Sequence, residues 1–473
     1  MRSKTQALIL LSRSRRATRL QTFRQEVITS TRTLSDDDAR HAPETHPTIR
    51  TGMRRAPSSA RALSRMNARV LRQLSLVLIA CFCVGGCRRQ AGDVVVKPAD
   101  EKVRIGAFMS LTGDTAQYGI SAYNGIRMAV EEANGTGGVA GHRVELIAQD
   151  TRSDPRETES VVRRLAEESH VHALVGEIVS SRSLAAARIA QGERVPMLTP
   201  SSTSPEVTTQ GDFIFRSCYT DPFQGAALAR FAAATLHARH AALLVDGGQR
   251  YSIELARIIR EEFVRRGGEV VAESEYREGA GDFTEQLSAV GSAHPDVVFV
   301  PGYYLEAGLL AQQAKRLGIQ APLVGGDGWD SPRLYEIGGQ SLAGDFFSSH
   351  FSADDQDPQV QRFVADYRRL FGSAPDAFAA TAYDAARIML DAIARAPSLE
   401  RAAIRDSLAA TKNFPGVTGT INFDAARNAV KSIVIIRIGD NGRQSVEAHV
   451  SPEDIPAPAT PTPTPTPQRK RRA

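Results

Sequence analysis

The chain has 473 residues, a formal net charge of +5 and a hydrophobic content of 42%. This length is enough for two or three globular domains, each with its own core. The positive charge would suggest an anionic partner, but it belongs to residues 1–86 and to the Arg-Lys-Arg-Arg run at 469–472. The body between these ends carries more acidic than basic residues, which argues against nucleic acid as a partner.

The N-terminal region contains a secretion pattern. Arg69 and Arg72 precede an apolar run at 74–84 that is too short to span a bilayer. Two glycines and Cys87 follow, and small residues before a cysteine resemble the lipobox of bacterial lipoproteins. We therefore expect a signal peptide at 66–86, lipidation of Cys87, a true start at Met66, and a disordered segment at 1–65. A buried helix with a chance cysteine is the alternative.

The C-terminal region predicts a tail without a fold. Thr and Pro alternate from 456 to 467, which favours an extended polyproline II spacer, so residues 450–473 are expected to be disordered. A contact between its basic end and anionic lipid or wall polymer is the alternative. Residues 87–101 are expected to be a linker. Cys218 has no predicted partner, so stability must come from the hydrophobic core.

Between these ends, signals for strands and helices alternate. Helix starts are marked by Asp154-Pro155, Asp221-Pro222 and Asp282. Apolar runs predict strands at 103–111, 144–148, 173–177, 195–198, 241–246, 270–275, 297–301 and 322–324. Because these runs are mostly continuous rather than alternating, they indicate parallel sheets covered by helices on both faces.

Two such series, at about 103–221 and 222–350, each have the size of one domain. Helices near 359–371, 376–396 and 399–410 follow, and then strands at 417–423 and 433–438. The sequence thus predicts an α/β protein with two lobes and a cleft where both present the ends of their strands.

A glycine-rich turn follows the predicted strand at 322–324. It reads Gly325-Gly326-Asp327-Gly328-Trp329-Asp330-Ser331 and places a carboxylate and the single tryptophan before a helix start. Asp327 is the first candidate for a ligand contact, because small molecules bind at strand-to-helix turns of open α/β sheets. The alternative is turn and capping chemistry alone, which explains Ser331 and Pro332 but not Asp327 or Trp329.

Several separated segments carry a family resemblance. Residues 102 to about 439 resemble the branched-chain amino acid-binding proteins, the type I periplasmic solute receptors of ABC importers. The resembling segments lie at 111–113 with 117–119, 134–139, 200–206, 302–304, 325–331, 375–379 and 416–420. The resemblance implies two Rossmann-like lobes with parallel central sheets, joined by three crossings that act as a hinge. It implies lobe I from 102–221 plus 351–428, and lobe II from 222–350 plus 429–449.

The resemblance also implies a ligand site. The positions that match the family's carboxylate donors are Ser180, Ser201, Ser202 and Thr203. Asp327 matches the acid that accepts the ammonium group. The matching side-chain walls are Tyr118, Tyr251 and Tyr303, followed by the weaker matches Ile178, Trp329 and Phe378. Without the resemblance, each tyrosine would be read as ordinary core packing.

Two departures from the family limit this transfer. Many relatives have a disulfide between two positions that match Ser153 and Val179 here. Glu177 stands where some relatives have histidine, and it could either favour a polar or cationic ligand side chain or face solvent.

Enzyme signatures are weak. Residues 135–140 fit a dinucleotide fingerprint by letter, but they follow a predicted helix instead of a strand. The sequence has no Walker A loop and no Gly-x-Ser-x-Gly elbow. The close histidine pairs at 170 and 172 and at 237 and 240 lack neighbouring ligands. We therefore expect no catalytic residues, no metal and no cofactor.

Together these features predict a monomeric, lipid-anchored receptor of the periplasm or cell surface. It would capture a free amino acid, branched-chain or otherwise aliphatic, by cleft closure, and deliver it to an ABC permease and ATPase complex. An alternative is an amino acid or amide sensor lipoprotein that signals to a membrane partner. A third is a lipoprotein that binds amides or peptides.

Overall fold

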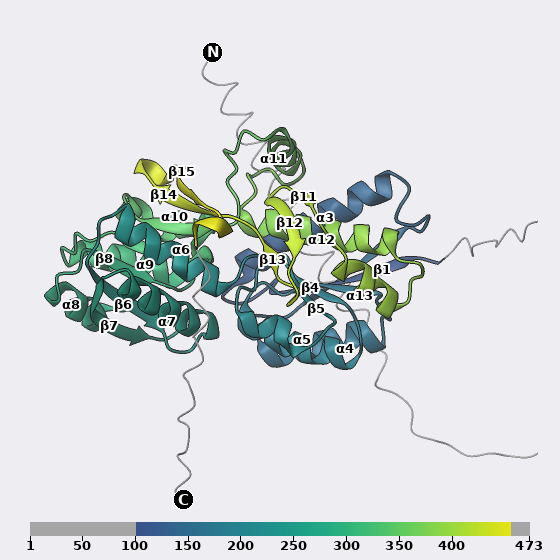
Figure 1. Ribbon diagram of the computed structural model, residues 1–473, viewed down its shortest axis with the longest axis horizontal. Helices are drawn as coiled ribbons and strands as arrows, with labels where there is room; N and C mark the ends of the chain where they lie inside the picture. The colour runs from purple at the N-terminus through teal and green to yellow at the C-terminus, as the bar shows by residue number, and fades with distance from the viewer. Residues whose placement is uncertain (1–100, 456–473) are drawn as a thin grey trace, which may run out of the picture. The chain divides into compact units, whose positions relative to one another are not determined.

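The computed structural model describes residues 101–455 (Figure 1). The predictions for the segment upstream of Met66, the signal peptide, the lipidation of Cys87, the linker up to residue 100 and the tail beyond residue 455 lie outside the described residues.

Lobe I is built on a five-stranded sheet in the order β2-β1-β3-β4-β5. All neighbouring strands in it are parallel. Its elements up to the first crossing are β1 (Val103–Met109), α3 (Ala116–Gly135), β2 (Val144–Asp150), α4 (Pro155–Glu167), β3 (Ala173–Gly176), α5 (Ser180–Gly192), β4 (Met197–Thr199), the 3-10 helix η1 (Pro205–Gln210) and β5 (Ile214–Arg216).

Lobe II is built on a seven-stranded sheet in the order β15-β14-β10-β9-β8-β6-β7. Its first elements are α6 (Asp221–Ala234), β6 (His240–Asp246), α7 (Arg250–Arg265), β7 (Glu269–Tyr276), α8 (Thr284–Ser292), β8 (Val297–Val300), α9 (Tyr304–Arg316), β9 (Leu323–Gly325), η2 (Asp327–Trp329), α10 (Pro332–Gly338), η3 (Gly339–Leu342) and β10 (Phe346–Ser349).

The chain then returns to lobe I and crosses once more to lobe II. The returning elements are α11 (Pro358–Phe371), α12 (Ala377–Arg395), α13 (Arg401–Ala409), β11 (Phe414–Gly416), β12 (Gly419–Phe423) and β13 (Ala429–Val430). Of these, α12 packs along α3. The last elements are β14 (Ile433–Ile438), η4 (Asp440–Gly442), β15 (Gln444–Val450) and η5 (Pro452–Asp454), with β14 antiparallel to β10. The expected α/β fold with three crossings between two lobes is confirmed.

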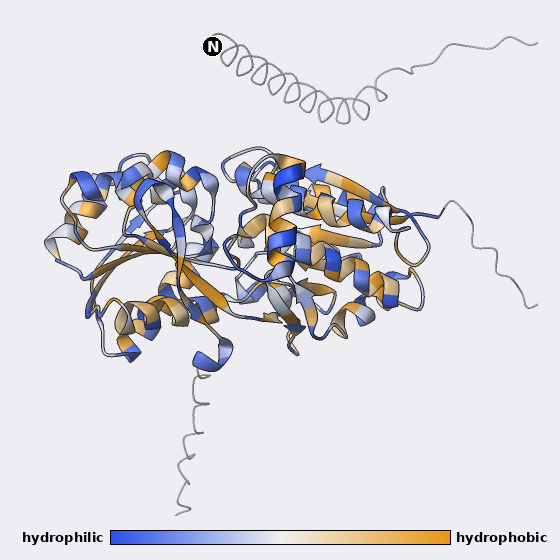
Figure 2. Cartoon of the chain, turned by 90° about the horizontal axis from the view of Figure 1, so that it is seen from above, coloured by the Kyte–Doolittle hydropathy of each residue, from blue (hydrophilic) through white to orange (hydrophobic). Residues whose placement is uncertain are grey.

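The central strands of the sheets carry the core because most of their residues are apolar and buried. Every residue of β8 is buried, as are the last six of β6. Figure 2 shows hydrophobic residues concentrated in the strands and hydrophilic residues on the outer faces of the helices. Between residues 101 and 455, no helix has both the length and the apolar character needed to cross a membrane.

Local sequence signals located some helix starts and turns correctly and missed others. Asp154 caps α4, with its side chain accepting from the N–H of Glu157, as expected. The strand predicted at 417–423 is present from Gly419 onward as β12, but β11, which forms a hairpin with it, was not predicted; Gly419, directly after the two-residue turn, has φ +99°. Such a backbone angle favours glycine, so this residue marks the end of the turn in which the predicted strand began. The strands β5, β10, β11, β13 and β15 were not predicted. Residues 450–454, predicted to belong to the disordered tail, instead form the end of β15 and η5.

Candidate ligand-binding site

The lobe I face of the site is formed by the loops that follow β3 and β4. These strands are parallel neighbours, so their carboxyl ends meet at one edge of the sheet. Ser180 follows β3 and begins α5, while Ser201 and Thr203 follow β4. The Ser180 Oγ accepts from the Ser204 N–H at 3.3 Å, and the Ser201 Oγ lies 2.7 Å from the Thr381 Oγ1. This face therefore presents hydroxyl groups.

The N-terminus of α5 adds backbone donors to these hydroxyls. The helix has 13 residues and begins at Ser180 beside the loop after β4. The residue at its N-cap is Val179, which supplies no capping side chain. The first N–H groups of a helix have no partner within it and carry a partial positive charge. This edge of lobe I is therefore suited to an anionic group.

The lobe II face is centred on Asp327, which follows β9. One carboxylate oxygen accepts from the Tyr251 Oη at 2.8 Å, and the other lies 3.1 Å from the His350 Nε2. Its backbone N–H donates to the Gln224 Oε1 at 2.8 Å. The loop that positions the carboxylate is thus fixed by three other elements of the fold.

Asp327 is a buried carboxylate without a cationic partner. It is 3% exposed, and within the described part of the chain its ion-pair contact is with His350. Burial lowers the pKa of His350, although Asp327 itself acts to raise it. The imidazole is therefore neutral near pH 7 and does not compensate the carboxylate. Leaving a buried charge uncompensated is costly, so this position favours a positively charged ligand group.

Aromatic rings connect the two faces. Tyr251 stacks on Tyr303 with ring centroids 5.4 Å apart, and Tyr118 lies 4.4 Å from Phe378 and 5.9 Å from Tyr303. The Tyr118 hydroxyl donates to the carbonyl of Gly328 and accepts from the Tyr304 N–H, so a side chain of lobe I is bonded to two loops of lobe II.

These groups surround a cavity of about 20 Å³. Its lining consists of Tyr118, Ile178, Val179, Ser180, Ser201, Thr203, Tyr251, Tyr303, Asp327, Gly328 and Phe378. The structure thus brings nine of the predicted site residues together. A space of this size holds about one water molecule, so an amino acid could enter only if the lobes move apart.

Two predicted site residues do not line this cavity. Ser202 lies inside lobe I, where its Oγ is 2.6 Å from the Ser183 Oγ and donates to the Ile178 carbonyl at 2.9 Å. Trp329 is fully buried in lobe II, and its Nε1 donates to the Val300 carbonyl at 3.1 Å. Both predictions are corrected: these side chains support the site from behind.

The glycines of the loop leave room for two aromatic side chains, Trp329 and Tyr251. A Cβ on Gly325 would lie 2.2 Å from the Trp329 ring, and one on Gly326 would lie 2.1 Å from the Tyr251 hydroxyl. Ser331 caps α10 by accepting from the Arg333 N–H. The turn alternative therefore accounts for the glycines and for Ser331, while Asp327 is left facing the cavity.

Neither expectation for Glu177 is met. The side chain is fully buried inside lobe I, where it pairs with Arg182 at 3.2 Å and accepts from the Ser110 N–H and Oγ. Arg182 in turn donates to Thr115 at 2.6 Å. Glu177 does not line the cavity and does not face solvent, because it completes a hydrogen-bonded network beneath the site.

Sequence reasoning missed two buried groups beside Asp327, His350 and Asp221. Asp221 had been interpreted as a helix cap, but Thr220 occupies the cap position, and the Asp221 side chain accepts from Gln224 inside the protein. Burial, followed by the charge of Asp327, raises the pKa of Asp221 to about 8. Asp221 is therefore mostly neutral at pH 7. The sequence alone does not show that Asp221 is buried close to Asp327.

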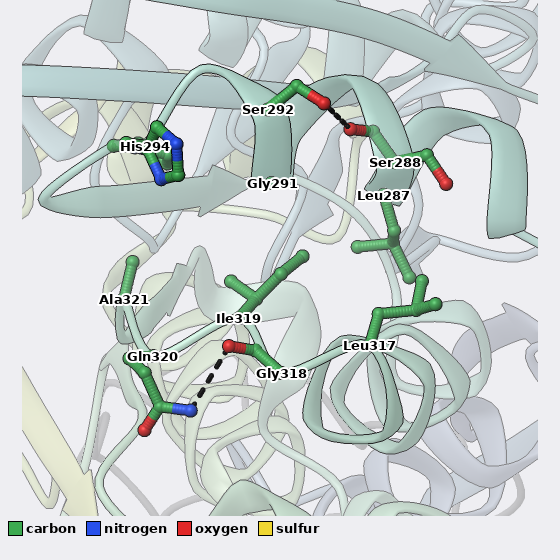
Figure 3. Close-up of a pocket in the computed structure, with 11 residues that line it drawn as sticks. Leu287, Ser288, Gly291, Ser292, His294, Leu317, Gly318, Ile319, Gln320 and Ala321 are labelled. Atoms are coloured by element: carbon green, nitrogen blue, oxygen red, sulfur yellow. Dashed lines mark hydrogen bonds between the residues drawn. The ribbon is translucent and has the colours of Figure 1, made fainter.

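A larger hollow of about 640 Å³ lies elsewhere in lobe II (Figure 3). It is formed by the ends of α8 and α9 and the segments leading into β8 and β9, at the opposite edge of the sheet from Asp327. His294 is the one ionisable side chain in its lining. The hollow therefore lacks the opposite charges that a zwitterion requires.

Comparison with known proteins agrees with this geometry. A family model described as periplasmic binding protein matches residues 102–443. The leucine-, isoleucine-, valine-, threonine- and alanine-binding protein of Pseudomonas aeruginosa is 29% identical over 335 residues, which cover 71% of this chain and 89% of the relative. The Leu/Ile/Val-binding protein BraC3 of Rhizobium johnstonii is 28% identical and covers 69% of this chain and 88% of its own.

Solved structures give the same result. The leucine-binding protein LivK of Thermotoga maritima is 38% identical, with a TM-score of 0.72. The branched-chain amino acid transporter substrate-binding protein LivJ of Streptococcus pneumoniae, solved with isoleucine, is 33% identical, with a TM-score of 0.70. Each match covers 74% of this chain and 99% of the other. The resemblance to branched-chain amino acid-binding proteins is confirmed, and the chain belongs to the periplasmic binding protein family, whose members are solute receptors and not enzymes.

Proposed function

We propose that the protein captures a free amino acid and delivers it to an ABC importer. The amino acid is branched-chain or otherwise aliphatic, and its side chain lies between the aromatic rings. The observation that carries this proposal is the buried Asp327 carboxylate, which has no cationic partner among residues 101–455 and shares a cavity with the hydroxyls of lobe I. A ligand with one positive and one negative end satisfies both faces at once.

Each end of the amino acid has a matching set of groups. The carboxylate would accept from Ser180, Ser201 and Thr203 and from the N-terminus of α5. The ammonium group would donate to Asp327, which is already held in place by Tyr251 and His350. Two charge-assisted contacts plus a buried aliphatic chain can supply about 8 kcal/mol, which corresponds to micromolar affinity.

Closure of the lobes would complete the site. Tyr118 bonds across the cleft to Gly328 and Tyr304, and Arg250 of lobe II pairs with Glu206 of lobe I. These contacts depend on the lobes being together, whereas the small cavity requires them to separate for ligand entry. We infer that the amino acid binds one lobe first and that closure then brings the other lobe over it.

The location and partners follow from the family and from the N-terminal sequence. Membership of the periplasmic binding protein family implies a place outside the cytoplasm. The small residues before Cys87 support anchoring by lipid at that residue. The names of the relatives, which include an amino acid transporter substrate-binding protein, support a permease and ATPase complex as the partner. We propose that the receptor acts as a monomer.

A thermal-shift screen tests the proposal. The full chain would be heated with free amino acids, amino acid amides and short peptides, each well above micromolar concentration. Free aliphatic amino acids should raise the melting temperature, because a ligand that binds only the folded state stabilises it. A response to peptides or amides without a response to any free amino acid would contradict the proposal.

A further inference from the structure

A buried arginine of lobe I is bonded to the loop that carries the cavity hydroxyls. Arg216 is the last residue of β5 and is fully buried. Its Nη1 donates to the Ser202 carbonyl at 2.6 Å. Ser202 lies between Ser201 and Thr203, which both line the cavity. The guanidinium therefore holds the middle of the loop whose neighbouring side chains face the ligand position.

The hydrogen-bond partners of this guanidinium are neutral groups. Besides the Ser202 carbonyl, it contacts Asn428, whose Oδ1 accepts from the Arg216 Nε at 2.9 Å. In the part of the chain that the structure describes, the Arg216 Nη2 is buried and has no hydrogen-bond partner. Arg182, a second buried arginine of lobe I, differs because Glu177 lies 3.2 Å from it and neutralises its charge.

The acidic groups that act on Arg216 do not neutralise it. Burial lowers the pKa of Arg216, and Cys218, Asp221 and Asp424 oppose this. Burial raises the pKa of the Cys218 thiol to about 12 and that of Asp221 to about 8, so both are mostly neutral at pH 7. Asp424 is exposed, so water and salt screen its charge. Because arginine stays charged at neutral pH, Arg216 is a buried cation that no acid among residues 101–455 neutralises.

One peptide group connects Arg216 to the cavity. Its carbonyl, that of Ser202, accepts from Arg216, and its N–H, on the opposite side of a trans peptide, belongs to Thr203. A cation bonded to a carbonyl polarises the peptide group and makes its N–H a stronger donor. Thr203 lines the cavity, so Arg216 makes this side of the cavity more favourable for an anion.

Resting on the proposed function, we propose that Arg216 is a positioning residue for the ligand's carboxylate. It holds the loop between Ser201 and Thr203 through the Ser202 carbonyl, and its charge favours an anionic group on the lobe I side. Buried charges of opposite sign then serve the two ends of the ligand, with Arg216 behind the carboxylate and Asp327 at the ammonium group. Because interactions between buried charges reach beyond contact distance, Arg216 makes the site prefer a free amino acid to its neutral amide.

Titration calorimetry with leucine and leucinamide tests this role. The two ligands share the ammonium group and the side chain, and the amide lacks the negative charge. Arg216→Gln removes the cation, so the affinity for leucine should fall by about tenfold, while the affinity for leucinamide should stay within about threefold of wild type. An equal loss for both ligands would show that Arg216 only supports the fold, and would overturn the proposal.

A second variant neutralises the charge without removing the arginine. Asn428→Asp places a carboxylate beside the Arg216 Nε, where the Asn428 Oδ1 now lies 2.9 Å away. The preference for leucine over leucinamide should fall in this variant as well, by about fivefold or more, because the new ion pair compensates the cation. This variant keeps the Arg216 side chain in place, so it tests the charge even if Arg216→Gln does not fold. An unchanged preference in Asn428→Asp would contradict the electrostatic role.

Two controls distinguish charge from packing. Arg216→Lys keeps the charge, so the preference for leucine over leucinamide should stay within about threefold of wild type. Arg427→Gln alters another arginine of lobe I, which donates to the backbone carbonyls of Ile214 and Thr208 and does not line the cavity. It should lower stability and leave the preference unchanged. If Arg427→Gln lowered the preference as much as Arg216→Gln, the position of Arg216 behind the loop would not be the cause.

The outcomes separate this inference from the proposed function. If the wild type binds leucine and the preference over leucinamide survives in both Arg216→Gln and Asn428→Asp, the role of Arg216 is wrong and amino acid capture stands. If the wild type binds neither leucine nor any other free amino acid of the thermal-shift screen, both proposals fail. A preference that falls in both variants and survives in Arg216→Lys supports both.

Discussion

The two lobes present the same architectural feature to the cleft but different chemistry. In each, loops at the carboxyl ends of parallel strands form the site. Lobe I offers neutral hydroxyls, and the charges of Glu177 and Arg182 neutralise each other beneath the surface. Lobe II offers the Asp327 carboxylate, which has no cationic partner in the described part of the chain. The difference shows that topology decides where a ligand binds, and that the side chains of each lobe decide which end of it they hold.

This asymmetry couples binding to closure. Lobe I alone can satisfy a carboxylate, and lobe II alone can satisfy an ammonium group. Under the proposed function, an amino acid gains both interactions when the lobes are together, so it would bind the closed form more tightly and shift the population toward it.

The largest expected effect comes from removing the charge of lobe II. Asp327→Asn keeps the shape of the side chain but leaves the ammonium group buried without a counter-charge. The affinity for the preferred amino acid should fall by roughly 100-fold or more, because breaking a buried ion pair costs about 3–5 kcal/mol. Titration calorimetry measures the change.

Asp345→Asn is the matched control for this variant. Asp345 is also a buried carboxylate of lobe II, but it bonds to the Leu323 N–H and does not line the cavity. Its substitution should leave the affinity unchanged. If Asp327→Asn bound the amino acid with unchanged affinity, Asp327 would not be part of the site. The proposal that lobe II holds the ammonium group would then be contradicted.

The next effect concerns the internal charges of lobe I. Glu177→Gln leaves the Arg182 guanidinium buried without its carboxylate partner. The free energy of unfolding should fall by about 3 kcal/mol, as expected when one member of a buried pair is removed. Urea denaturation measures this change. A large loss of ligand affinity without a loss of stability would show instead that Glu177 acts on the ligand.

Smaller effects are expected for the hydroxyls of lobe I. Thr203→Val and Ser180→Ala each remove one hydrogen-bonding group from the cavity lining. Each should weaken binding by about 1–2 kcal/mol, or roughly 5- to 30-fold. Ser202→Ala, the control one residue away, should lower stability and leave affinity nearly unchanged, since its hydroxyl bonds inside lobe I. If Ser202→Ala lowered affinity as much as Thr203→Val, the Ser202 hydroxyl would have to contact the ligand, which would contradict its placement inside lobe I.

The last effect concerns the dependence of stability on pH and does not involve the ligand. Burial raises the pKa of Asp345 to about 7 from an ordinary value of 3.8. Between these two values the folded state keeps a proton that the unfolded state has released, so this residue's contribution is full below pH 4 and is lost as pH rises through about 7. Asp345→Asn should therefore be more stable than wild type at pH 8 and similar to it at pH 4. Parallel melting-temperature profiles for the two proteins would contradict this.

The sequence predicted the fold where local patterns agree with the tertiary structure. Continuous apolar runs located the buried parallel strands, and the Asp154-Pro155 pair located the start of α4. Most of β12 was predicted, but its partner β11 was missed and the predicted strand began two residues early, in the turn of the hairpin. Gly419 was the signal that could have revealed it.

The sequence predicted only part of the site, and Ser202 shows the physical reason why one position was wrong. Successive residues of an extended segment point to opposite sides, so Ser201 and Thr203 face the cavity while Ser202 faces the interior. This alternation could have been read from the sequence. The positions of His350 and Asp221 could not, because they follow strands that are far apart in sequence and meet only when lobe II folds.

The central claim is that one lobe holds the carboxylate and the other holds the ammonium group of the same ligand. Titration calorimetry with the preferred free amino acid, its amide and its N-acetyl form tests this most directly, because each blocked form lacks one of the two charges. The account predicts that both blocked forms lose roughly 100-fold or more in affinity, since each leaves one face of the cleft unsatisfied. A blocked form that binds as tightly as the free amino acid would contradict it.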